Sequence, residues 1–209
     1  MEASSGDILP PVELPAPIEQ LAAAAALELG WNGEVLPPMT LFGRYVSVVA
    51  RLRPDAHAER LCFGAQPELD RTTVATWVWP EMAKFAPPTA AEIIGVFSVT
   101  RHWRTALASA APFAKWSGAA IVLPWEVASS TDFLVRCLPR TQRHGVSVLT
   151  ANPDGDVTVN QVNRREPGPH EHTAASRWVN EMVYARLLEA YSATSEFDMA
   201  GEDITADQP

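Results

Sequence analysis

An alternation of short apolar runs and helix-like stretches in the middle of the chain constrains the fold most. Residues 93–99 read Ile-Ile-Gly-Val-Phe-Ser-Val, and residues 119–123 and 146–150 are similar apolar runs. Such runs are typical of strands covered on both faces of a sheet. Residues 101–116 and 130–144 lie between them and carry apolar side chains at helical spacing, and Gly118 and Gly145 end them. This order predicts a partly parallel sheet with helices on its faces.

The flanking segments complete an α/β fold. We expect an antiparallel meander, then a β-α-β-α-β-β unit and a C-terminal helix, with a Rossmann-like domain as the alternative. The turn Asn152-Pro153-Asp154-Gly155 predicts a hairpin. The remaining expected elements are a helix over 18–29, strands over 41–53, 60–65, 72–79 and 157–162, and a helix from Thr173 to about Tyr191 with Trp178, Met182, Ala185 and Leu188 on its inner side.

Two polar tails are expected to flank a single domain over residues 18–194. Residues 1–17 carry four prolines among acidic and small residues, and this composition predicts a disordered arm. Residues 195–209 carry five acidic residues and no basic one, and they predict an acidic disordered tail. Neither segment has enough apolar residues to form a core.

Charge and cysteine content bear on the compartment and the partners. The net charge is -9, with 25 acidic against 16 basic residues, so the chain as a whole is a poor general binder of anionic DNA. It has neither a leader nor a membrane-spanning run, which predicts a cytoplasmic protein. Cys62 and Cys137 stand in apolar surroundings and are expected to be reduced core thiols, with a disulfide as the alternative. All basic residues except Lys84 and Lys115 are arginine, a bias that favours a GC-rich bacterial genome.

The order of elements over residues 93–162 resembles the second half of the restriction-endonuclease-like fold, the PD-(D/E)XK nuclease superfamily. In that family a strand bearing Glu-x-Lys leads into a helix, a short apolar strand, a second helix and a further strand. The resemblance implies that a carboxylate and a lysine stand where this chain has Phe97 and Val99. Neither side chain can hold Mg²⁺ or polarise water. The resemblance therefore implies a degenerate, non-catalytic member.

Other catalytic chemistry has little support in the sequence. The aspartate of the nuclease motif could only be Asp70, and Glu126 follows a central strand, where α/β proteins place their binding crevice. His170-Glu171-His172 lacks the further ligands that a metal site needs. A phosphate-binding loop, a dinucleotide glycine motif and a serine elbow are all missing. We therefore expect no catalytic residue, metal or cofactor.

Two arginine clusters are the candidate binding residues. Arg101 and Arg104 open one predicted helix, where arginines at a helix N-terminus can hold a phosphate or carboxylate. Arg136, Arg140 and Arg143 form a positive face on the next helix. Helices that share one sheet face would combine the five arginines into a patch able to bind nucleic acid. We expect instead that the helices lie apart and that each arginine pairs with an acid, because acids outnumber bases.

Two tryptophans are the candidate protein contact. Trp77 and Trp79 would lie on one face of the strand expected over residues 72–79, and tryptophan is enriched at protein interfaces. The leading hypothesis is a non-catalytic adaptor with a protein partner, as a pseudo-nuclease subunit of a nucleic-acid-processing or defence assembly. Nucleic acid is a possible partner that the net charge disfavours. The alternatives are a metal-dependent nuclease with displaced residues and a small-ligand-binding α/β regulator.

Overall fold

The computed structural model describes residues 13–163 and 173–202, with side chains to residue 193. The expected α/β class is confirmed. The elements are α1 (Ile18–Glu28), β1 (Glu34–Val35), β2 (Met39–Leu41), β3 (Arg44–Leu52), α2 (Pro54–Cys62), α3 (Arg71–Thr76), η1 (Ala83–Phe85), β4 (Ala91–Val99), α4 (Trp103–Ala110), η2 (Ala111–Phe113), β5 (Gly118–Pro124), α5 (Trp125–Ala128), the π-helical η3 (Phe133–Cys137), α6 (Leu138–His144), β6 (Ser147–Ala151), β7 (Val157–Gln161) and α7 (Ala174–Glu202).

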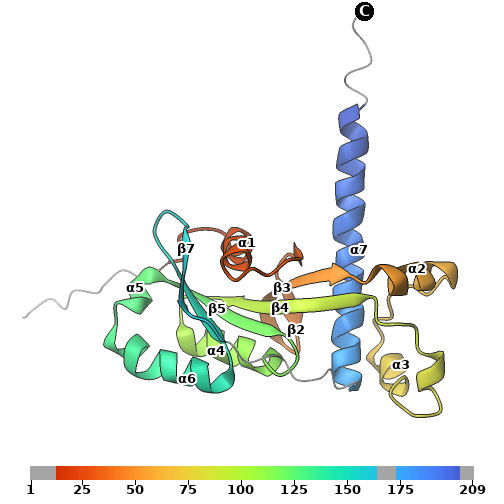
Figure 1. Cartoon of the computed structure of the whole chain (residues 1–209), viewed down its shortest axis with the longest axis horizontal. Coiled ribbons are helices and arrows are strands. Elements are labelled where there is room, and N and C mark those ends of the chain that lie inside the picture. Colours follow the sequence, from red (N-terminus) through yellow and green to blue (C-terminus); the bar gives the residue numbers. More distant parts are fainter. Residues whose placement is uncertain (1–12, 164–172, 203–209) are drawn as a thin grey trace, which may run out of the picture.

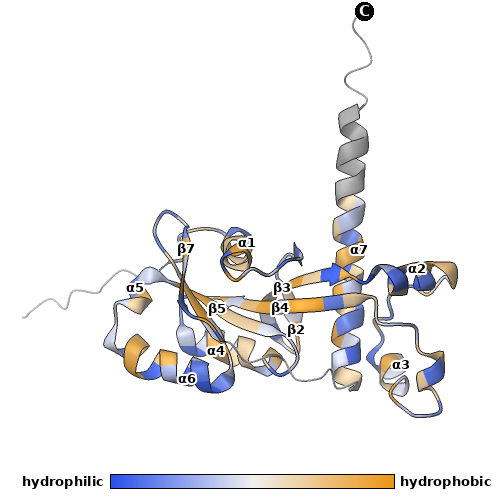
Figure 2. Ribbon diagram, in the orientation of Figure 1, coloured by the Kyte–Doolittle hydropathy of each residue, from blue (hydrophilic) through white to orange (hydrophobic). Residues whose placement is uncertain are grey.

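The strands form one mixed sheet in the order β1-β3-β4-β5-β6-β7, and β2 pairs with β3. β3 runs antiparallel to β4, whereas β4, β5 and β6 are parallel, and β7 returns antiparallel to β6. The β-α-β-α-β-β unit agrees with the sequence prediction. The first part is antiparallel as expected, but it is built from β1, β2 and β3 rather than from the predicted strands after residue 53. In Figure 2 the hydrophobic colour is concentrated on the central strands, β4 in particular.

The helices cover the two faces of the sheet unequally. Phe97 and its partner in β5, Ala120, pack against α1 on one face. Val96 and its partner Ala119 face the other side, which holds α4, α6 and the first part of α7. Figure 1 shows α1 above the sheet and α4 and α6 below it. The two crossover helices share a face because both parallel connections run in the same direction along the sheet.

The side chain of Trp31 occupies the space above two glycines of the central strands, where a larger residue would not fit. Its ring lies over Gly95 in β4 and Gly118 in β5, and it packs on Phe97 at 4.5 Å between ring centroids. A Cβ added at Gly95 would lie 2.2 Å from the ring, and one at Gly118 would lie 2.7 Å from it. Both glycines therefore make room for the indole.

Helix α7 begins as predicted, but its buried side differs. The backbone N–H of Ser176 donates to Oγ1 of Thr173 at 3.1 Å, which caps the helix. The apolar side chains predicted to face inward are only partly buried. The helix packs against the sheet and also against the segment between β3 and β4, and the side chains buried by these contacts are Val179, Val183, Tyr184 and Leu187.

The segment between β3 and β4, residues 53–90, is called the insert below. The strands expected over 60–65 and 72–79 are wrong, since these residues belong mainly to α2 and α3. Pro54 occupies the first turn of α2, where its fixed φ favours a helix. The carboxylate of Asp70 caps α3 by accepting from the backbone N–H groups of Thr72 and Thr73. Figure 1 shows the insert beside α7.

The ends of the chain depart from the predicted domain limits where they are described. Leu14 and Ala16, from the predicted arm, pack against the cluster under α1. α7 continues to Glu202, past the predicted limit at residue 194. The rest of both predicted tails, residues 1–12 and 203–209, lies outside the described residues. No helix in the described part of the chain is both long and apolar enough to cross a membrane.

The cysteine expectation is half confirmed. Both thiols are free, so the disulfide alternative is wrong. Cys137 is buried as expected. Cys62 is exposed and is not a core thiol, because it ends α2, whose side chains point mainly to solvent.

Candidate functional site

A hollow of about 660 Å³ lies where the parallel strands β4 and β5 end. Its wall includes Arg101, His102 and Arg104 from the start of α4, with Ser130 and Asp132 from the segment after α5. The carboxyl ends of parallel strands are where α/β sheets commonly hold ligands. The sequence-predicted cluster around Arg101 therefore lies at the position that the topology favours for binding.

Trp103 anchors this site. Its side chain is buried between α4 and η3, among Leu107, Phe133 and Cys137. Its indole Nε1–H donates to Oδ2 of Asp132 at 2.7 Å. The indole thus ties the start of α4 to the start of η3, and it fixes where Asp132 stands.

Asp132 joins the two arginine clusters. Oδ1 of Asp132 lies 3.2 Å from Nη1 of Arg136 and 3.7 Å from Nη2 of Arg104. The Trp103 hydrogen bond is the largest cause that lowers the pKa of this carboxyl below its usual value, followed by the charges of Arg104 and Arg136. Asp132 is therefore ionised at neutral pH and is shared by two guanidinium groups.

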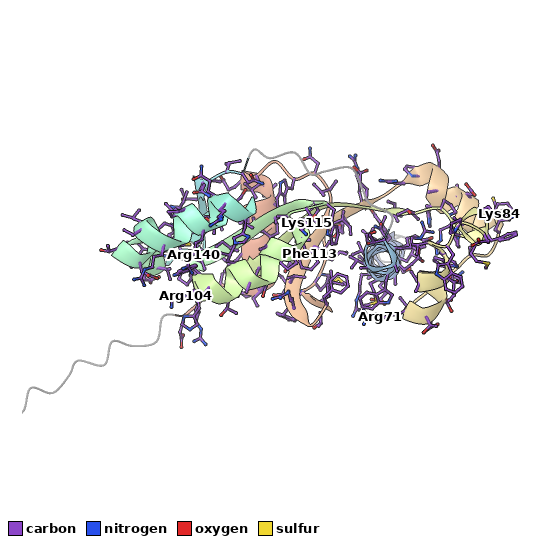
Figure 3. The ribbon with its side chains drawn as sticks, turned by 90° about the horizontal axis from the view of Figure 1, so that it is seen from below. Arg71, Lys84, Arg104, Phe113, Lys115 and Arg140 are labelled. Atoms are coloured by element: carbon purple, nitrogen blue, oxygen red, sulfur yellow. The ribbon has the colours of Figure 1, made fainter. Side chains whose placement is uncertain are left out.

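The guanidinium groups of two arginines also lie over the indole ring of Trp103. The Arg104 guanidinium carbon lies 5.1 Å from the ring centroid and that of Arg140 lies 5.7 Å from it. Both distances are within the range of cation–π attraction. Figure 3 shows Arg104 and Arg140 on neighbouring helices of one face. One buried ring therefore orients an arginine from each predicted cluster.

The expectation that the two helices lie apart is wrong. α4 and η3–α6 cover the same sheet face and share one apolar cluster, because both crossovers run the same way. The expected pairing holds for Arg104 and Arg136, which share Asp132. Within the described residues, Arg101, Arg140 and Arg143 form no ion pair. The face that carries the five arginines and Asp132 is called the α4–α6 face below.

The two positions that would carry the carboxylate and the lysine of a nuclease, by the resemblance given above, are buried. Phe97 and Val99 pack under α1. Asp70 caps α3, and its hydrogen bonds with Thr73 are the main cause of its lowered pKa. Glu126 is exposed on α5. No group of three or more metal-ligating side chains occurs among the described residues, and His170-Glu171-His172 lies outside them.

The one buried thiol of the region offers no nucleophile. Cys137 is the last residue of η3, and burial, with a smaller contribution from Asp132, raises its pKa to about 12. A thiol with this pKa stays protonated at neutral pH.

The predicted tryptophan pair is separated. Because residues 71–76 are helical, Trp77 stands at the end of α3, half-buried, while Trp79 lies in the next turn with 57 % of its surface exposed. Trp79 has exposed apolar neighbours in sequence on the insert, namely Met82 and Phe85. The exposed apolar surface predicted for a strand over residues 72–79 therefore lies on the insert, which has no strand there.

Sequence reasoning missed Asp132, although one signal was available. Asp132 and Arg136 are four residues apart, the spacing of a helical ion pair. The bond from Trp103 to Asp132 spans 29 residues and had no local signal. The comparisons found no matching family model, no matching curated protein and no matching solved structure.

Proposed function

We propose that this chain is a non-catalytic binding subunit whose α4–α6 face engages a nucleic-acid backbone. The observation that carries the proposal is local charge. Five arginines lie on this face and only two of them, Arg104 and Arg136, pair with Asp132, although the whole chain has a net charge of -9. Phosphate contacts by arginine supply most non-specific affinity for nucleic acid. The burial of Trp103 holds Arg104 and Arg140 in place before a partner arrives.

We further propose that the domain is a degenerate restriction-endonuclease-like fold, a pseudo-nuclease in a nucleic-acid-processing or defence assembly. An antiparallel β3–β4 pair followed by a parallel β4-α4-β5 unit supports this assignment. The burial of Phe97 and Val99 supports the loss of metal chemistry. Purified protein should show no Mg²⁺- or Mn²⁺-dependent cleavage of DNA or RNA. Cleavage that Asp70→Asn or Glu126→Gln abolished, with the fold intact, would overturn this assignment in favour of a nuclease with displaced residues.

The binding test is an anisotropy titration of a labelled DNA duplex and a labelled RNA at about 50 mM salt, where several phosphate contacts give measurable affinity. The double variant Arg136→Glu and Arg140→Glu should abolish binding. Arg44→Glu with Arg186→Glu changes the net charge equally on β3 and α7, and it should retain most of the binding. Equal losses in both variants, or no binding by the wild type, would contradict the proposal.

A second candidate function, docking of a partner protein, is favoured by the insert. Leu61, Phe63, Trp79 and Phe85 expose between 57 % and 79 % of their surfaces there. Exposed aromatic side chains are common anchors of protein interfaces. Capture from the native host should yield one stoichiometric partner that Trp79→Ser loses and Leu27→Ser, on α1, retains. A partner kept by both variants would place the contact elsewhere.

A further inference from the structure

A second hollow lies between the insert and α7, on different elements from the α4–α6 face. Its volume is about 530 Å³, within the range of small-molecule sites. Arg53 lines it from the start of the insert, Trp77 and Pro87 from later in the insert, and Arg177 from the first turns of α7.

Positive charge in this hollow is not balanced by its own wall. Two guanidinium groups, those of Arg53 and Arg177, line it, and none of the described residues that line it carries a carboxylate. The neighbouring Glu181 is already committed. Its oxygens accept from Arg60 at 2.8 and 2.7 Å and from the backbone N–H of Glu68 at 3.0 Å. Arg53 forms no ion pair within the described residues.

Only some of the N–H donors of Arg177 have a hydrogen-bond acceptor among the described residues. One terminal nitrogen donates to Oγ1 of Thr89 and the other to the carbonyl of Pro87, and its Nε–H is buried without an acceptor in the described part of the chain. A guanidinium has five N–H donors. Burial is the largest cause that lowers the pKa of Arg177; the nearby charge of Glu181 acts against it and that of Arg60 adds to it. Each terminal nitrogen carries a second N–H beyond the bond to Thr89 or Pro87, so an anion that enters the hollow would meet a desolvated cation with donors to spare.

The rest of the wall is apolar and includes an aromatic plane. The Arg177 guanidinium lies 5.2 Å from the Trp77 ring centroid, so cation and indole are presented together. Val78, Ala86 and Pro87 continue the apolar surface. We propose that this hollow binds a small organic anion, with its carboxylate or phosphate between Arg53 and Arg177 and its flat apolar body against Trp77.

The test uses benzoate, phenyl phosphate, benzamide, acetate and inorganic phosphate with the full chain. Binding is followed by calorimetry and by the ¹H–¹⁵N signal of the Arg177 Nε–H. Benzoate or phenyl phosphate should bind saturably at millimolar concentration and shift that signal. The two compounds distinguish a carboxylate from a phosphate source. Benzamide lacks the charge, while acetate and inorganic phosphate lack the ring, so each should bind at least about tenfold more weakly.

Arg53→Gln is the main variant because Arg53 is exposed, so its loss should leave the fold intact. It should weaken binding of the aromatic anion about tenfold, the value of one charge-assisted hydrogen bond. Arg51→Gln, which removes a neighbouring exposed arginine paired with Glu92, should leave binding unchanged. Equal binding of benzoate and benzamide, equal effects of the two variants, or no binding of either aromatic anion would overturn the proposal. None of these outcomes bears on nucleic-acid binding by the α4–α6 face.

Discussion

The α4–α6 face and the insert both contain arginine–carboxylate ion pairs, but the pairs on the face are exposed to solvent and the pair at the insert is buried. On the α4–α6 face, Asp132 stands in partly exposed surroundings between Arg104 and Arg136, whose side chains are 63 % and 61 % exposed. At the insert, Arg60 and Glu181 are 0 % and 1 % exposed. An exposed pair is weak and can exchange partners, whereas a buried pair fixes a structure because neither charge can be left alone.

The buried pair organises the insert around α7. Besides its two bonds to Glu181, Arg60 donates to the carbonyls of Ala65, Gln66 and Pro88, and its guanidinium lies 4.5 Å from the Tyr184 ring centroid. These contacts fix the two ends of a loop-rich segment on one helix. The buried pair therefore stabilises the insert on α7, whereas the exposed arginines of the α4–α6 face are the ones that we propose to contact nucleic acid.

The largest expected effect follows from breaking the buried pair. Glu181→Gln leaves the Arg60 charge buried without its counterion, so the free energy of unfolding in urea should fall by about 3–5 kcal/mol. Glu189→Gln removes an exposed partner of Arg186 on the same helix and should cost less than about 1 kcal/mol. Similar losses for the two variants would remove the distinction between the pairs.

A smaller effect is expected from the cap of α3. Asp70→Ala removes the acceptor of two backbone N–H groups and should lower Tm by about 2–4 °C. The pKa of Asp70 is lowered in the folded state, so its contribution is present above the unfolded pKa of about 3.9 and is lost as pH falls through the folded value. The Tm difference between wild type and variant should therefore be full at neutral pH and shrink in strong acid. A difference that persists there would show that the cap acts without its charge.

The smallest effect is a gain. Asp132→Asn keeps an acceptor for the Trp103 indole but removes the charge that Arg104 and Arg136 share. Affinity for duplex DNA should rise by a factor of about 1.4–5, the range of an exposed ion pair. Glu19→Gln, the same charge change on α1 across the sheet, should have little effect. A loss of affinity in Asp132→Asn would mean that Asp132 positions the arginines rather than competes for them.

The part of the chain that carries the α4–α6 face and the insert also differ in how well the sequence predicts them. The four strands between Ala91 and Gln161 lie within two residues of their predicted bounds because their apolar runs are clear in the sequence. The helices agree less well: α4 and η2 end before residue 116, the next helix begins as the π-helical η3, and α5 was not predicted. The strand prediction over residues 72–79 was wrong because α3 has only six residues, and its threonines, followed by Trp77, have the composition of a strand. Its helical state depends on the Asp70 cap and on packing against α7, which local periodicity does not encode.

Long-range contacts limited the site prediction as well. The arginines of the α4–α6 face were named from the sequence, but their union depends on both crossovers covering one face. The partners Arg60 and Glu181 are 121 residues apart and each has ordinary neighbours in the sequence. The reason for a buried glutamate near the start of α7 is seen only when the insert is placed beside that helix.

The salt dependence of DNA binding tests the central claim most directly. Three to five phosphate contacts by the α4–α6 face predict that the logarithm of the association constant falls with the logarithm of salt concentration, with a slope of about -2.7 to -4.5. Arg140→Gln should reduce the steepness by about 0.9, the value of one phosphate, and Arg186→Gln should leave it unchanged. A slope near zero, or one that Arg140→Gln leaves unchanged, would contradict the account.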